Sequence, residues 1–287
     1  MAPVVAVAGD IACDPSDDFF NNGLGVIGVC RQRQTSDLLL RTDLTRILIP
    51  GDTQYERGEL GAYRVSFDPT WGRLKPLIRP VPGNHEYETL GAAGYFDYFN
   101  GEGQYDGPAG KRDEGYYSFD VGTWHIVGLN SECLNVAGFC GPQSRQARWL
   151  REDLLRNRRP CTLGFWHGPR FTSGRFSEER ESVLPFWDAL YVADGDLVVN
   201  GHEHFYERFA PQTPHGIPDA RRGLRQFIAG MGGRGHHDFV RVERNSEFRD
   251  NQTLGVLMLT LKARGYDWQL VRAPGGSVID SGSGVCH

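Results

Sequence analysis

The sequence DLVVNGHEH, residues 196–204, places a glycine and two histidines directly after a short apolar run. The run predicts a buried strand, because it is too short and too rich in β-branched residues for a helix. If the chain stays extended beyond Gly201, His202 and His204 lie on the same side of it. Two imidazoles on one side of a strand end are typical of a metal site, although a loop pair making ordinary hydrogen bonds has the same sequence.

Four further strand-like runs also end in polar side chains. The runs VVAVAGD, RILIPGD, LIRPVPGNHE and TLGFWH end in Asp10, Asp52, Asn84, His85, Glu86 and His167. A glycine precedes the polar group in all of them except TLGFWH, which permits a sharp turn and a close approach of the chain to a ligand. Polar groups at the carboxyl ends of adjacent strands converge on one crevice of an α/β sheet. Carboxylates, an amide oxygen and imidazoles in this number suit two hard or borderline cations, so we expect a two-metal site.

The alternation of strand-like and helical patterns predicts the fold class. Helices are expected near residues 33–41, 58–66, 92–99, 144–157 and 178–190, and a hairpin is expected over residues 116–129. From residue 225 onward the pattern contains strands alone. This order predicts an α/β sandwich with helices outside and a strand-rich end, and the absence of a linker favours a single domain over residues 1–287.

The charge pattern excludes some partners. The 31 basic and 36 acidic residues are mixed along the chain, and they give a formal net charge of −5 without a basic arm. A nucleic-acid-binding surface is therefore not indicated. No apolar run approaches the ~20 residues of a membrane span, and the sequence leaves the oligomeric state open.

The six cysteines provide evidence on the cellular compartment of the protein. They are even in number, lie in loops or at strand edges, and form no CxxC motif. Six cysteines allow about fifteen pairings. Proximity in the sequence favours Cys13–Cys30 and Cys133–Cys140, which leaves Cys161–Cys286. Disulfides favour a secreted, periplasmic or extracellular protein whose leader was removed. The alternative is six free thiols in a cytoplasmic enzyme, because no signal peptide precedes VVAVAG.

The strand-end motifs together resemble those of the metallophosphoesterases, also called calcineurin-like phosphoesterases. The motifs stand here as GDIAC, GDTQY, GNHEY, GFWHGP and GHEH, and they extend from Gly9 to His204. The resemblance implies a four-layer α-β-β-α sandwich of the metallophosphoesterase type with a strand-rich C-terminal part. It also implies a metal-dependent phosphoric ester hydrolase that uses two metal ions.

Two positions place the resemblance in the purple acid phosphatase-like branch. Many family members carry a histidine ligand two residues after the first aspartate, and here that residue is Ala12. The motif GDTQY instead supplies Tyr55, in the Asp-x-x-Tyr arrangement of purple acid phosphatases. A phenolate favours Fe(III) at that site, with Fe(II), Zn or Mn at the other. The alternative for Tyr55 is an aromatic side chain that merely packs at a helix start.

The resemblance implies one metal held by Asp10, Asp52, Tyr55 and His204, and a second held by Asp52, Asn84, His167 and His202. A metal-bound hydroxide would attack phosphorus in line. His85 matches a family histidine near the leaving group, so we expect it to act as the general acid. The alternative is that His85 only orients Asn84 or the nucleophile.

Substrate contacts are less clearly marked in the sequence. Purple acid phosphatases usually have another histidine about ten residues after the one that matches His167, and here the segment carries Arg170 and Arg175 instead. These arginines and His236, from the glycine-rich sequence AGMGGRGHHDF, are candidate substrate-binding residues. The expected substrate is a small-molecule phosphate monoester. The alternatives are a phosphodiesterase acting on nucleotides or lipid head groups, and a non-catalytic metal-binding wall protein.

Overall fold

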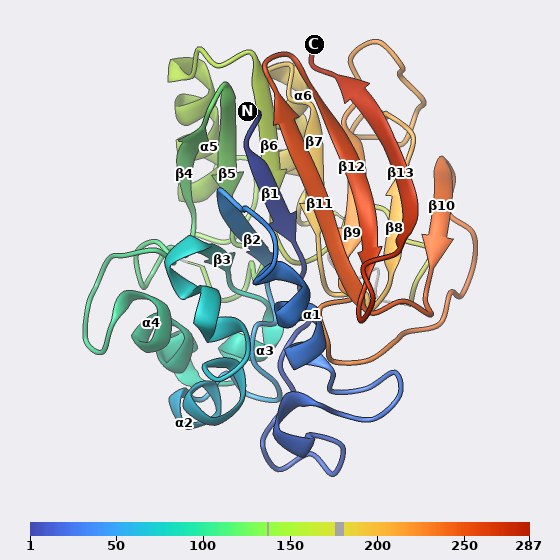
Figure 1. The fold of residues 1–287 in the computed structure, drawn as a ribbon. Helices are drawn as coiled ribbons and strands as arrows, with labels where there is room; N and C mark the ends of the chain where they lie inside the picture. The colour runs from blue at the N-terminus through green and yellow to red at the C-terminus, as the bar shows by residue number, and fades with distance from the viewer. Residues whose placement is uncertain (137, 176–180) are drawn as a thin grey trace.

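The computed structural model describes residues 1–136, 138–175 and 181–287, and two β-sheets form its centre (Figure 1). The first sheet has six strands in the order β13-β12-β11-β1-β2-β3. Strands β1, β2 and β3 are parallel, and β11, β12 and β13 extend the sheet as antiparallel neighbours. The strands are β1 (Val4–Val7), β2 (Arg46–Pro50), β3 (Ile78–Val81), β11 (Gly255–Lys262), β12 (Gly265–Arg272) and β13 (Val278–Val285).

The second sheet has seven strands in the order β10-β8-β9-β7-β6-β5-β4. Strands β5, β6, β7 and β9 are parallel, and β4, β8 and β10 are antiparallel to their neighbours. The strands are β4 (Tyr117–Val121), β5 (Trp124–Gly128), β6 (Cys161–Phe165), β7 (Leu197–Asn200), β8 (Tyr206–Phe209), β9 (Arg225–Ala229) and β10 (Ser246–Asp250).

Successive side chains of the strands point to opposite faces of each sheet and pack into separate apolar cores, which gives four layers. Val5 and Val7 of β1 belong to the apolar core that also contains Phe227 of the second sheet, whereas Ala6 belongs to a separate core on the helix side. A third apolar cluster joins the outer face of the second sheet to two helices. The two sheets therefore pack face to face, and helices cover their outer faces.

The helices divide between the two outer layers. Leu39 and Phe96, from α1 and α4, contribute to the core outside the first sheet, and Leu150 and Phe186, from α5 and α6, to the core outside the second. The α-helices are α1 (Gln32–Leu39), α2 (Leu60–Ala62), α3 (Asn84–Tyr87), α4 (Ala93–Asn100), α5 (Arg145–Arg156) and α6 (Leu184–Val192). Short turns of 3-10 or π type are η1 (Asn21–Gly23), η2 (Tyr63–Phe67), η3 (Trp71–Leu77) and η4 (Leu90–Ala92).

The predicted fold class, an α/β sandwich with a strand-rich C-terminal part, is confirmed. The helix expected near 178–190 begins only at Leu184, and residues 178–180 lie outside the described part of the chain. Strand β8 is not predicted by the sequence pattern, because its sequence YERF is polar. Its buried Glu207 is satisfied by the backbone N–H of Ser173 at 2.8 Å and by the hydroxyl of Ser246.

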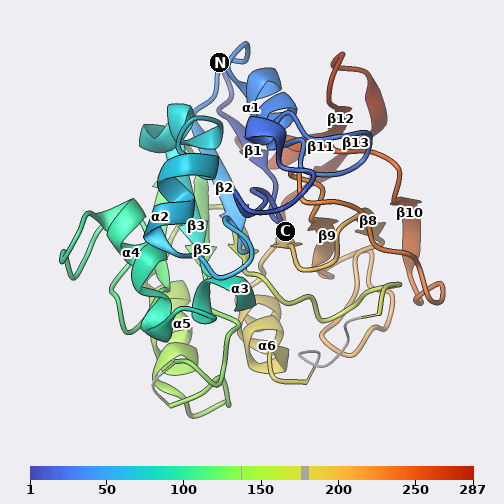
Figure 2. The ribbon, with the colours of Figure 1, turned by 90° about the horizontal axis from the view of Figure 1, so that it is seen from below.

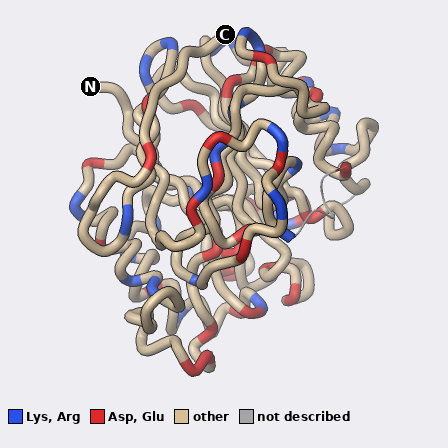
Figure 3. The backbone as a smooth tube through the Cα atoms, turned by 90° about the vertical axis from the view of Figure 1, so that its right-hand side faces the viewer, with Lys and Arg blue, Asp and Glu red and all other residues tan. Residues whose placement is uncertain are grey.

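The predicted cysteine pairs are all present as disulfides, Cys13–Cys30, Cys133–Cys140 and Cys161–Cys286. Figure 3 shows basic and acidic residues intermixed along the chain on the side it presents. Among the described residues, no helix is long and apolar enough to cross a membrane.

The ends of the parallel strands determine where a site can form. The chain leaves β1, β2, β3, β6 and β7 at the lower end of the molecule in Figure 1, and Figure 2 views this end directly. The motifs that carry the predicted ligands follow these strands, so the fold gathers them at one end of the two sheets.

Candidate functional site

Two glycines allow the loops at this end to pack against one another. At Gly51 φ is +84°, and a Cβ atom there would lie 2.3 Å from Nδ1 of His167. A Cβ atom at Gly83 would lie 2.2 Å from Oδ1 of Asp52. A larger residue at either position would displace a predicted ligand, so both glycines serve the close approach expected from the sequence.

Several predicted ligands occupy the left-handed backbone region. The φ angles are +59° at Asp10, +48° at Asp52 and +71° at His202. Such angles are uncommon for residues with a Cβ atom and cluster at functional sites. The chain therefore does not stay extended beyond Gly201, and the condition under which both histidines would lie on one side is not met. The chain turns at His202, and His202 and His204 reach two adjacent clusters of side chains.

The first cluster surrounds the hydroxyl of Tyr55. Its Oη atom lies 3.0 Å from Oδ1 of Asp10, 2.9 Å from Oδ2 of Asp52 and 2.9 Å from Nε2 of His204. Tyr55 and both aspartates are buried. A single phenolic proton cannot satisfy both carboxylates, so the cluster holds more acceptors than donors.

The second cluster lies against the first. Nδ1 of His167 donates to the carbonyl of Pro50 at 2.9 Å, which leaves Nε2 facing Oδ1 of Asn84 at 3.1 Å. Nδ1 of His202 lies 3.1 Å from both of these atoms. Oδ2 of Asp52 lies 3.3 Å from Nε2 of His167, so Asp52 belongs to both clusters.

The geometry of these clusters fits metal ions. Atoms bound to one ion at about 2.0–2.2 Å lie roughly 2.8–3.6 Å from one another, and the separations above fall in this range. Asp52, His167 and His202 offer donor atoms that all lie within 4.8 Å of one another. Nitrogen and oxygen donors without thiolate suit iron, manganese or zinc. The residues present therefore fit a pair of cations that share Asp52.

The protonation of two of the three imidazoles agrees with this fit. Burial, reinforced by the neighbouring His167, lowers the pKa of His202 to about 3. Burial and His237 lower the pKa of His204 well below its usual value. Both rings are neutral at physiological pH and keep a lone pair for a ligand bond. At the third, His167, burial lowers the pKa but the Asp52 carboxylate outweighs it and raises the pKa well above its usual value, so a cation would take the place of the proton on Nε2.

The acidic groups respond differently to the same environment. Burial raises the pKa of Asp10 to about 7. At Asp52 the neighbouring imidazoles outweigh burial and lower the pKa of the carboxyl. Burial and the two carboxylates raise the pKa of Tyr55, so a phenolate at this position requires a strongly charged cation.

Buried Glu86 fixes the loops that carry the shared ligand. Its carboxylate accepts the backbone N–H groups of Asp52 at 3.0 Å, Thr53 at 2.9 Å and Gly83 at 2.8 Å. It also accepts the hydroxyl of Thr53 at 2.8 Å. The motif GNHEY contains this acid but does not reveal its role, which is to hold the GD and GNHE loops together.

A cavity of about 340 Å³ opens beside the first cluster, and His85 lies in its wall. Nδ1 of His85 donates to the carbonyl of Glu56 at 2.6 Å, and Nε2 lies 4.0 Å from Oδ2 of Asp52. Burial lowers the pKa of His85, but the Asp52 carboxylate prevails and raises it above the usual value. A protonated His85 therefore presents an Nε2–H group next to the candidate metal site.

The candidate substrate-binding residues lie in different places. His236 lines the cavity, as does His237, whose ring stacks on His204 with centroids 3.7 Å apart. Arg170 is buried, donates to the carbonyl of Pro214 at 2.6 Å, and does not line the cavity. Arg175 is exposed and directly precedes residues 176–180, which lie outside the described part of the chain.

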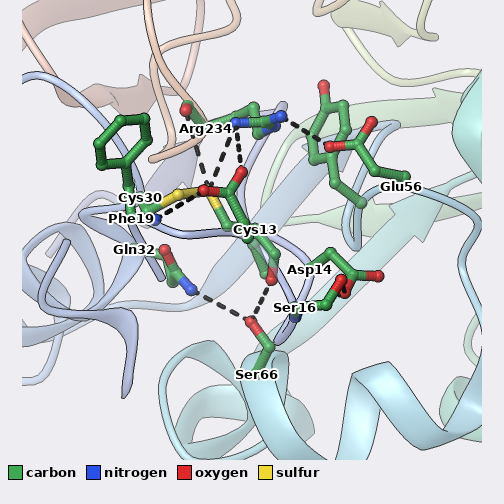
Figure 4. The surroundings of a disulfide bond; sticks show 12 residues. Cys13, Asp14, Ser16, Phe19, Cys30, Gln32, Glu56, Ser66 and Arg234 are labelled. Carbon is green, nitrogen blue, oxygen red and sulfur yellow. Dashed lines mark hydrogen bonds and ion pairs between the residues drawn. A yellow bond between two sulfur atoms is a disulfide. The ribbon is translucent and has the colours of Figure 1, made fainter. Parts of the chain in front are cut away.

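Arg234 is a cavity residue that the sequence analysis missed. Its guanidinium lies 5.3 Å above the ring of Tyr55, and Nη2 donates to Oε1 of Glu56 at 2.6 Å (Figure 4). The available signal was the glycine-rich sequence GMGGRG after β9, because glycines allow this loop to approach the strand ends closely.

These features define a class, a two-sheet α/β protein that carries a candidate site for two cations at the ends of its parallel strands. The model of the calcineurin-like phosphoesterase family matches residues 5–206. The chain belongs to this family, whose members are metal-dependent phosphoesterases.

Named relatives place the chain in the purple acid phosphatase-like branch. It is 31% identical over 194 residues to probable purple acid phosphatase 20 of Arabidopsis thaliana, covering 62% of this chain and 43% of that protein. It is 28% identical over 195 residues to purple acid phosphatase 21 of the same plant, covering 62% and 42%. The chain thus spans less than half the length of these relatives.

The fold is shared with purple acid phosphatase PPD1 from yellow lupin. The TM-score is 0.76 at 18% sequence identity, and the match covers 99% of this chain and 53% of that chain. The structure of PhoD has a TM-score of 0.65 at 11% identity, covering 99% of this chain and 70% of that chain.

Proposed function

We propose that the protein hydrolyses phosphate monoesters with two cations bound at the strand ends. The observation that carries this proposal is the shared carboxylate. Oδ2 of Asp52 lies 2.9 Å from the hydroxyl of Tyr55 and 3.3 Å from Nε2 of His167. One cation would be held by Asp10, Asp52, Tyr55 and His204, and the other by Asp52, Asn84, His167 and His202.

The donor types favour a particular pair of metals. The hard, anionic oxygen of Tyr55 favours Fe(III), whereas the imidazoles and the amide oxygen suit Fe(II), Zn or Mn. When bound, the two cations would polarise the phosphoryl oxygens and activate water for attack on phosphorus.

His85 would supply the proton that the leaving alkoxide needs. The bond from its Nδ1 to the carbonyl of Glu56 fixes the ring, so that the protonated form points Nε2–H toward the cavity. A donor fixed in this way stabilises the leaving oxygen as its charge develops.

The test is metal content, visible absorption and turnover of one preparation expressed with added iron. We expect two metal ions per chain, hydrolysis of p-nitrophenyl phosphate in preference to bis(p-nitrophenyl) phosphate, and a broad tyrosinate-to-iron absorption band. Tyr55→Phe should abolish the band, whereas Tyr95→Phe, in a buried tyrosine bonded to the carbonyl of Pro80, should retain it. A colourless enzyme with zinc or manganese in both sites would contradict the iron assignment, and a preference for the diester would contradict the monoester assignment.

We also propose that residues 1–287 act as one catalytic domain and that the protein is exported. Support comes from the disulfides, of which Cys161–Cys286 joins β6 to the end of the chain. Mass mapping of the protein from its native host without reduction should detect all three pairs. Alkylatable cysteines in that native protein would contradict export.

A further inference from the structure

The segment between Cys13 and Cys30 forms a wall beside the cavity. The Cys13–Cys30 disulfide closes the segment, and Arg234 contacts Sγ of Cys13 at 3.7 Å (Figure 4). Val26 and Val29 exchange backbone hydrogen bonds of 3.0 and 3.2 Å, which makes a tight turn. The disulfide and the turn therefore hold this wall in a fixed position.

The tip of this turn is apolar and exposed. Ile27 is 93% exposed, and Leu24 and Val26 are 48% and 45% exposed. Val29 lines the cavity, and a Cβ atom at Gly28 would lie 3.7 Å from Cδ2 of His236. We call Leu24, Val26, Ile27 and Val29 the apolar rim, because Val29 lines the cavity and the other three are exposed in the segment that leads to it.

The opposite parts of the cavity are polar. His85, Arg234 and His236 line it beside the candidate metal site. A phosphate group occupies on the order of 90 Å³, the volume of about three water molecules, so most of the 340 Å³ cavity remains for the rest of an ester. A substituent that leaves the cavity beside Val29 would be close to Val26 and Ile27, because Val26 pairs with Val29 through two backbone hydrogen bonds.

We propose that the apolar rim binds the hydrocarbon part of the substrate, and that the preferred substrates are phosphate monoesters of alkyl alcohols. This inference rests on the proposed function and adds the substrate class. Continuity of the rim with the cavity identifies the occupant, because a chain attached to a phosphate at the metal site would lie on it. Burial of this chain and of Ile27 would remove apolar surface of both partners from water.

The test is the dependence of kcat/KM on chain length for monomeric n-alkyl phosphates from butyl to octyl. Full burial of one methylene gives roughly a fourfold gain, and an open rim that covers one side should give about twofold. The octyl ester should therefore exceed the butyl ester by roughly 15-fold in the holoenzyme. Ile27→Ser should reduce this octyl-to-butyl ratio by roughly fivefold, because it removes the most exposed part of the rim.

Leu155→Ser is the matched control, since Leu155 is a 73% exposed leucine on α5, outside the second sheet. It should leave the octyl-to-butyl ratio unchanged. A flat chain-length series in an enzyme that hydrolyses butyl phosphate would overturn this inference alone. An unchanged ratio in Ile27→Ser, or an equal fall in Leu155→Ser, would overturn it as well. Absence of turnover of any ester, including p-nitrophenyl phosphate, would overturn the proposed function together with this inference.

Discussion

Two clusters of histidine and aspartate in this molecule use the same residue types in different ways. In the His125 cluster, Nδ1 of His125 lies 2.9 Å from Oδ1 of Asp120, and Nε2 lies 2.7 Å from Oδ2 of Asp153. Each ring nitrogen thus has its own carboxylate, and the cluster joins β4 and β5 to α5. When the imidazole is charged, each ring nitrogen carries a proton and donates it to its own carboxylate.

At the strand ends the nitrogens and oxygens converge on common points. Nε2 of His167, Nδ1 of His202 and Oδ1 of Asn84 lie 3.1 Å from one another. Nδ1 of His167 donates to the carbonyl of Pro50, away from these atoms, so Nε2 is the ring nitrogen available to a cation. Composition alone does not distinguish the two clusters. Convergence of acceptors without enough protons is what indicates a cation.

Asp52→Asn should have the largest effect, because it weakens the one carboxylate that belongs to both halves of the site. We expect activity on every ester to fall to background and the metal content to drop below two ions per chain. Asp120→Asn is the control from the His125 cluster, and it should keep both metals and full activity. Equal metal loss in the two variants would show that the distinction between the clusters is wrong.

His85→Ala should slow the enzyme by about 10²–10⁴-fold on an alkyl phosphate while both metals remain bound. The loss should be slight for p-nitrophenyl phosphate, because its phenolate leaves without a proton. The measurement is kcat for both esters together with metal analysis. An equal loss on both esters would assign His85 to positioning of the phosphate or nucleophile, and loss of a metal would make it a ligand.

Glu86→Gln should weaken metal binding by about 10–100-fold, the usual effect of removing a group that orients ligands. The amide has one acceptor oxygen for the N–H groups of Asp52, Thr53 and Gly83, and its NH₂ group would face donors. Competition with a chelator measures the affinity. Glu207→Gln changes another buried carboxylate, in β8, and should alter stability but not metal affinity.

The sequence predicted the fold and the candidate ligands from strand ends, because strand runs and their following residues are local features. The fold is confirmed, and the structure brings Asp52, His167 and His202 together. The features that could not be predicted from the sequence depend on contacts between distant segments of the chain. Arg234 reaches Tyr55 only through the loop after β9.

The turn at His202 also needed the structure, because nothing in a GHEH motif separates an extended chain from a φ of +71°. Its cause is tertiary, since the backbone N–H of His202 donates to Oδ2 of Asp10 at 3.0 Å, across 192 residues of sequence. Asp10 becomes available as a partner only after the two sheets have packed. This tertiary hydrogen bond then overrides the local backbone preference of His202.

His125→Gln should have the smallest effect, on stability alone and with a defined pH dependence. Burial lowers the pKa of His125, but Asp153 and Asp120 outweigh it and raise the pKa above the unfolded value of about 6.5. A raised folded pKa stabilises the protein fully below that unfolded value, and the contribution disappears as pH rises through the folded pKa. The free energy of unfolding of the wild type should therefore exceed that of His125→Gln by about 1 kcal/mol near pH 6, and by less near pH 9. The difference is modest because solvent screens the half-exposed Asp120. Urea unfolding across this range measures the difference, and His215→Gln, at an exposed histidine, should show no such trend. A stability difference that grows with pH would mean that His125 is neutral in the folded protein, and the contrast between a proton-satisfied cluster and a cation site would fail.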